Sequence, residues 1–218
     1  MLHSSKTNSD NPEGQNSLVL GADNKKKARA AFLIGGAQFA VFMIVAEAVY
    51  PNYNVSENYI SDLGVWGQTS AVIFNPSIIL SGLLTLGGAF FTQKAFRKRR
   101  FSALIALSGL GALLVGFFPE NTVLVSGVPV VHSIAALIAF IFGPVAAIAS
   151  YRVTALPFKY FSVILGAGSL VALFLFLATF SSDFLGLGAG GMERMIVYPS
   201  LLWTICFGGY MMASAGQK

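Results

Sequence analysis

Six long stretches without a charged residue run through this 218-residue chain and constrain its fold more than any other feature. They cover residues 30–46, 63–93, 101–119, 121–151, 160–182 and 195–217. A helix needs about 20 apolar residues to cross a bilayer, and the apolar residues here do not alternate with polar ones as in barrel strands. The sequence therefore predicts an all-α fold, a polytopic membrane protein with a six-transmembrane-helix bundle. We place the spans at residues 29–50, 70–93, 101–118, 130–150, 160–180 and 194–215.

The composition excludes the common soluble classes of protein. Only 11% of the residues are charged, whereas a soluble domain carries about 25%. The single cysteine, Cys206, excludes an internal disulfide and a Cys-based zinc cage. Catalytic zinc sites usually use three protein ligands, and His132 is the only histidine outside the N-terminal segment. We therefore expect no metal and no cofactor.

The N-terminal segment differs from the rest of the chain. Residues 1–24 are rich in Ser, Asn, Asp and Gly and poor in large apolar side chains, a composition that buries too little surface to fold. The sequence predicts a disordered cytoplasmic tail over residues 1–24 and a transmembrane domain over residues 25–218. The first span is expected to act as an uncleaved anchor.

The basic residues predict the orientation. Thirteen of the 14 Lys and Arg residues fall within residues 1–29, in the connections at 94–100 and 152–159, or at the C-terminus. All of these lie on one side of a six-span protein, so the positive-inside rule places both termini in the cytoplasm. The basic runs are then a topology signal, and we expect no nucleic-acid partner.

Polar residues gather at the opposite, outer side, which holds six acids and Arg194. They belong to three segments, 50–64, 117–121 and 190–194, and to the adjoining helix ends. We expect their side chains to converge on one outward-facing pocket. The candidate pocket residues are Glu47, Ser61, Asp62, Asn75, Glu120, His132, Arg194 and Tyr198.

Some of these outer residues could instead have purely structural roles. Arg194 could pair with Glu120 or Asp62, because a charge at a membrane-helix end needs a partner or water. His132 could be a hydrogen-bonded histidine of the bundle, and Gly64 would suit a left-handed turn.

Small residues recur every four positions in three predicted helices. The stripes are Ser77, Ser81, Thr85 and Ala89; Ser108, Ala112 and Gly116; and Ala135, Ala139 and Gly143. Small residues let helices approach closely in lipid. A self-contained bundle would turn these stripes inward, whereas a subunit of a larger complex would leave one facing outward.

Several motifs carry a family resemblance. Tyr50-Pro51-x-Tyr53-Asn54, Ile60-Ser61-Asp62-Leu63-Gly64, Ile73-Phe74-Asn75 and Gly82 resemble the signature of the membrane family called domain of unknown function 998. Phe118-Pro119-Glu120, His132 and Glu193-Arg194 resemble it as well. The resemblance implies a six-helix protein of an archaeal or bacterial cell membrane, with no established activity. The Ile-Ser-Asp-x-Gly…Ile-Phe pattern is also similar to the DRAM and Sfk-type membrane proteins, which are associated with lipid handling.

These features favour a non-enzymatic bundle whose outer pocket binds a lipid headgroup, a small solute or a partner protein. One alternative is an accessory or structural subunit, with membrane-protein subunits as partners. Another is a membrane-embedded enzyme that acts on outer-leaflet lipid, with Asp62, Glu120 and His132 as candidate acids and bases.

Overall fold

The computed structural model of the chain describes residues 12–122, 130–179 and 186–213. Six α-helices account for most of these residues: α1 (Pro12–Val49), α2 (Ala71–Phe96), α3 (Arg99–Phe117), α4 (Val130–Ala149), α5 (Phe158–Thr179) and α6 (Gly188–Ala213). Two short 3-10 helices, η2 (Ser61–Gly64) and η3 (Ser150–Arg152), lie between them. Each of the six α-helices contains a segment long and apolar enough to cross a membrane. The predicted all-α architecture with six spans is therefore confirmed.

The N-terminal segment differs from its prediction. The helix α1 begins at Pro12, so residues 12–24 are helical, although the sequence predicted a disordered tail there. A helix that has already nucleated gains one hydrogen bond for each residue added, which favours extension from the apolar span. The ion pair between Asp23 and Lys27, four residues apart at 2.8 Å, adds to this extension. Residues 1–11 lie outside the described part of the chain.

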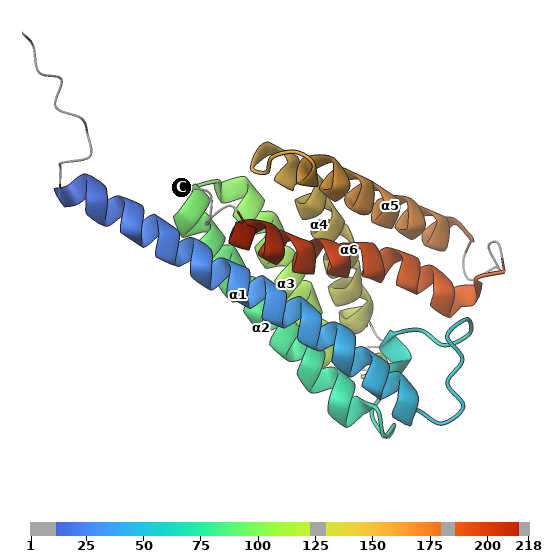
Figure 1. The fold of residues 1–218 in the computed structure, drawn as a ribbon. Helices are drawn as coiled ribbons and strands as arrows, with labels where there is room; N and C mark the ends of the chain where they lie inside the picture. The colour runs from blue at the N-terminus through green and yellow to red at the C-terminus, as the bar shows by residue number, and fades with distance from the viewer. Residues whose placement is uncertain (1–11, 123–129, 180–185, 214–218) are drawn as a thin grey trace, which may run out of the picture.

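The helices form a ring in sequence order. Each helix packs against the next, and α6 also packs against α1, which closes the ring. Figure 1 shows the start of α1 and the end of α6 at one end of the bundle, while the connection between α1 and α2 lies at the other end. The basic residues of the α2–α3 connection therefore share an end with the N-terminal part of α1. The assignment of this end to the cytoplasm stays a prediction.

Small residues bring neighbouring helices into backbone contact. A Cβ atom added at Gly82 of α2 would lie 2.6 Å from the backbone nitrogen of Leu113 in α3. A Cβ atom added at Gly111 of α3 would lie 2.6 Å from the backbone nitrogen of Ala139 in α4. All three predicted stripes turn toward the inside of the ring. Some of their residues are buried between helices, and others line an internal cavity.

An aromatic cluster fills the basic end of the ring. The ring of Phe207 in α6 stacks on Trp203 at 5.2 Å and lies 5.6 Å from Phe32 in α1 and 5.8 Å from Phe101 in α3. At the same end, Lys94 lies over the ring of Phe90, 4.4 Å from its centroid. This packing closes the basic end, so access to the inside of the ring must be sought at the other end.

Candidate functional site

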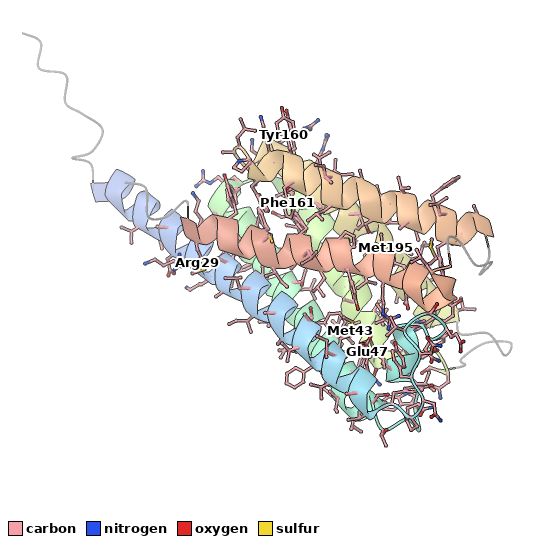
Figure 2. All side chains as sticks on the ribbon, turned by 45° about the vertical axis from the view of Figure 1, so that its right-hand side comes forward. Arg29, Met43, Glu47, Tyr160, Phe161 and Met195 are labelled. Carbon is pink, nitrogen blue, oxygen red and sulfur yellow. The ribbon has the colours of Figure 1, made fainter. Side chains whose placement is uncertain are left out.

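The connection between α1 and α2, residues 50–70, covers the outer end of the ring, and we call it the outer cap. Figure 2 shows it beside Glu47, at the end of the bundle where α1 finishes and α6 begins. The cap contains η2 and two buried apolar residues, Ile60 and Leu63, which point into the bundle. Polar side chains from α2, from α6 and from the segment after α3 hold other parts of the cap.

Arg194 of α6 is the main anchor of the cap. Its side chain is buried, at 4% relative exposure. One guanidinium nitrogen donates to the carbonyl oxygens of Val55 at 3.0 Å and Asn58 at 3.1 Å in the cap, and to that of Gly190 at 2.9 Å. The other donates to the carboxylate of Glu47 at 2.6 Å. The predicted partners, Glu120 and Asp62, are therefore wrong, and the partner of Arg194 is Glu47.

Tyr53 completes this arrangement, which we call the Arg194 clamp. The Tyr53 hydroxyl accepts a hydrogen bond from Arg194 and donates one to the carbonyl oxygen of Tyr59 at 3.0 Å. Burial raises the pKa of Tyr53 to about 12, against the opposing influence of Arg194. The phenol therefore keeps the proton that it donates to Tyr59.

The first turns of α6 hold the cap through two further contacts. Glu193 accepts a hydrogen bond from the backbone nitrogen of Ile60. The backbone nitrogen of Gly190 donates to the carbonyl oxygen of Ser56 at 2.9 Å. A side chain at Gly190 would collide with the carbonyl oxygens of Val55 and Asn58, so only glycine lets the cap approach α6 this closely.

The segment after α3 holds the opposite edge of the cap. The Ser61 hydroxyl donates to the carboxylate of Glu120 at 3.0 Å. Asn121 forms two hydrogen bonds with the backbone of Trp66, both at 3.0 Å. The cap is thus fastened to α6 on one side and to the α3–α4 connection on the other.

Two predicted pocket residues stabilise the cap itself. Asp62 accepts hydrogen bonds from the backbone nitrogen of Tyr59 at 2.9 Å and the side chain of Asn58 at 3.1 Å. Asn75 donates to the carbonyl oxygen of Gly64 at 2.9 Å. Gly64 does not adopt a positive φ, contrary to the prediction; instead, a Cβ atom there would collide with Asn75 and Phe74.

A cavity of about 140 Å³ lies beneath the cap, in the middle of the ring. Its walls come from α1, α2, α3, α4 and α6, and the cap residues Ile60 and Ser61 close its outer end. Most of the wall is apolar or carries small residues, with the hydroxyl groups of Ser81, Thr85, Ser108, Ser200 and Thr204 further along the helices. His132 and Glu193 line the cavity as well.

His132 brings a directed nitrogen atom to this cavity. Its ring is buried, at 7% relative exposure. Its Nδ1 atom lies 2.9 Å from the carbonyl oxygen of Phe118, which can only accept, so Nδ1 carries the hydrogen. In the uncharged form of the imidazole with this tautomer, the Nε2 atom is a hydrogen-bond acceptor. Within the described residues, no side chain or backbone group bonds to it.

The structure divides the eight predicted pocket residues among three places. Ser61 and His132 line the cavity. Glu47, Glu120, Arg194, Asp62 and Asn75 fasten or stabilise the cap. Tyr198 lies on the surface of α6, at 37% relative exposure, although it shares this helix with the buried Arg194.

Glu193 was not among the residues predicted for the pocket. Its side chain is buried, at 6% relative exposure, and lines the cavity. Its position next to Arg194 in the sequence could have indicated this, because adjacent residues of a helix point about 100° apart and so face different surroundings. One of the pair can therefore hold the cap from the outer side of α6 while the other faces the cavity. Among the described residues, no three His, Cys, Asp or Glu side chains are grouped to hold a metal ion.

Comparison with known proteins gives a family and no characterised relative. No curated protein matches the chain significantly, and no solved structure does. The similarity to the DRAM and Sfk-type proteins stays a prediction. One family, described as "protein of unknown function (DUF998)", matches residues 33–210. This range includes the outer cap, the Arg194 clamp and every residue that lines the cavity. The chain therefore belongs to the DUF998 family.

Proposed function

We propose that the protein binds a small amphiphilic molecule, or the end of a membrane lipid, in the cavity beneath the outer cap. The observation that carries this proposal is a mostly apolar cavity with polar groups at one end. Its 140 Å³ is comparable to an engineered cavity of about 150 Å³ that holds benzene. Ser61, His132 and Glu193 stand where such a molecule would turn its polar end toward the cap.

The energetic cost of the cavity supports a functional role. A cavity left empty inside a protein lowers its stability, because the atoms that line it lose packing contacts. Larger side chains at Ala112, Ala136 or Gly143, which all line the cavity, would fill it. A sequence selected only for stability would carry these larger side chains. A bound ligand would fill the cavity instead and offset its cost.

The inward direction of the small-residue stripes favours this proposal over that of an accessory subunit, since such a subunit would leave a stripe free for its partner. The enzyme alternative has less support. Of its three candidate acids and bases only His132 lines the cavity, while Asp62 and Glu120 are engaged in holding the cap.

We propose further that the cap faces the outside of an archaeal or bacterial cell membrane. The support is the distribution of charge, because eleven of the twelve Lys and Arg residues that the structure describes belong to segments at the opposite side of the bundle. The ligand would then be drawn from the outer leaflet or from the space beyond it.

A native mass spectrum of the protein, extracted gently from its own membrane, tests the binding function. We expect the wild type to carry a bound molecule and the cavity-filling variant Ala112→Leu to lose it. Ala136→Leu fills the cavity from α4 and should do the same. The matched control is Ala103→Leu, which adds the same side chain to α3 at an exposed position and should retain the molecule.

Two results would contradict the binding function. One is a wild-type protein without any bound molecule. The other is a bound molecule that both cavity-filling variants retain while they remain folded by circular dichroism.

A further inference from the structure

The polar groups at the capped end of the cavity share one chemical property, because each offers a hydrogen-bond acceptor. In the uncharged imidazole, whose hydrogen lies on Nδ1 and faces the carbonyl oxygen of Phe118, the Nε2 atom of His132 offers a lone pair. The hydroxyl proton of Ser61 goes to Glu120, which leaves the lone pairs of its oxygen. The carboxyl group of Glu193 is the third acceptor, and one of its oxygens already takes the Ile60 amide.

No cationic side chain offsets these acceptors. Among the described residues that line the cavity there is neither a lysine nor an arginine. Arg194, although adjacent to Glu193, directs its guanidinium to Glu47, Tyr53 and the cap carbonyls. Further along the cavity, the hydroxyl of Thr204 donates to the backbone oxygen of Ser200 and is already engaged.

We infer that the cavity selects ligands whose polar end is a hydrogen-bond donor, an alcohol or an amine, and rejects ligands that end in a carboxylate or a phosphate. An anionic group would face the lone pairs of these three groups, and the lining residues that the structure describes include no lysine or arginine to offset its charge. The inference rests on the proposed binding function and names the ligand class of the same cavity.

Four probes with one chain length test the selection: octan-1-ol, octylamine, octanoate and octyl phosphate. The protein is placed in nanodiscs of an uncharged lipid, and the midpoint of thermal unfolding is measured against probe concentration. The same titration on Ala112→Leu reports the effect of each probe on the bilayer alone, and this effect is subtracted. We expect octanol and octylamine to give saturable increases, with apparent Kd values at least about 10-fold below those of the two anions.

The results of this titration distinguish a failure of the proposed ligand selection from a failure of the proposed binding function. If octanoate or octyl phosphate stabilises the wild type as strongly as octanol, and Ala112→Leu abolishes the effect, the selection is wrong and the binding function stands. If none of the four probes acts on the wild type differently from Ala112→Leu, both are contradicted.

The variant Glu193→Gln provides a second test at the acceptor itself. Glutamine keeps an oxygen for the Ile60 amide and adds an NH₂ donor that can face the cavity. We expect octanoate to bind this variant at least about 10-fold more tightly than the wild type, and octylamine to bind it more weakly. Unchanged Kd values for both probes would contradict the assignment of Glu193 as the selecting group.

Discussion

Replacing Arg194 with alanine should lower the free energy of unfolding by about 3–5 kcal/mol, the usual cost of removing one partner of a buried ion pair. The substitution leaves the partly buried carboxylate of Glu47 without its cation. It also leaves the carbonyl oxygens of Val55 and Asn58 without their donor. Unfolding in a titration with sodium dodecyl sulfate measures the loss. Hydrogen exchange should locate it in the outer cap, where amides such as that of Ile60 lose protection.

Two further variants test whether the loss of stability is specific to the contacts of Arg194. Arg152→Ala removes an exposed arginine at the opposite end of the bundle and should change the free energy of unfolding by less than about 0.5 kcal/mol. Arg194→Lys keeps the charge but not the planar fork, so it should recover only part of the loss. An Arg194→Ala protein as stable as the wild type, with unchanged exchange in the cap, would contradict the clamp.

Replacing Gly82 with alanine should destabilise the bundle by about 1–3 kcal/mol, the typical cost of overpacking a close contact. The added methyl group would meet the backbone of α3, including the carbonyl oxygen of Gly109 at 2.8 Å. Backbone atoms cannot rotate away as a side chain can, so α2 and α3 must move apart. The same titration with sodium dodecyl sulfate measures the effect.

The matched control for Gly82 lies on the same helix. A Cβ atom added at Gly87 has no neighbour within 4 Å. Alanine is the better helix former by about 0.5–1 kcal/mol, so Gly87→Ala should leave the stability unchanged or raise it. Equal destabilisation by both variants would show that the packing of α2 on α3 is not the cause.

The spans could be predicted because they depend on local sequence alone. Length, hydropathy and the absence of charge locate a membrane helix without knowledge of its neighbours, and the helices α2 to α6 lie close to their predicted ranges. The small-residue stripes predicted close packing of the helices from the same local pattern, but the sequence left open whether every stripe faces inward. The helical segment 12–24 was missed because composition does not report that an adjoining helix can extend.

The partners of the polar residues could not be predicted in the same way. Glu120 and Asp62 were the predicted partners of Arg194, although Glu47 stands near the same outer end of the chain's spans. The choice depends on the closure of the ring, which packs α6 against α1 and brings Glu47 to Arg194. Only the three-dimensional arrangement contains this information.

The outer polar residues have different roles, as Glu193 and Arg194 illustrate. Both contact the cap, but only Glu193 also lines the cavity. As a group the outer polar residues suggested one pocket, but most of them fasten the outer cap and only a few reach the cavity. The DUF998 resemblance follows the same division. Tyr53 belongs to the clamp, Ser61 and His132 line the cavity, and Gly82 packs α2 on α3. In this chain the residues that carry the resemblance therefore fall in the clamp, in the cavity wall and in the contact between α2 and α3.

The most direct test of the capped cavity is an experimental density map of the wild-type protein in nanodiscs of its native lipid. We predict density for a bound molecule inside the ring, beneath Ile60. The polar end of this molecule should lie within hydrogen-bonding distance of His132 or Glu193. In a parallel map of Ala112→Leu this density should be absent while the cap stays in place. An empty cavity in the wild type, or the same density in both maps, would contradict the claim that this cavity is the binding site of the protein.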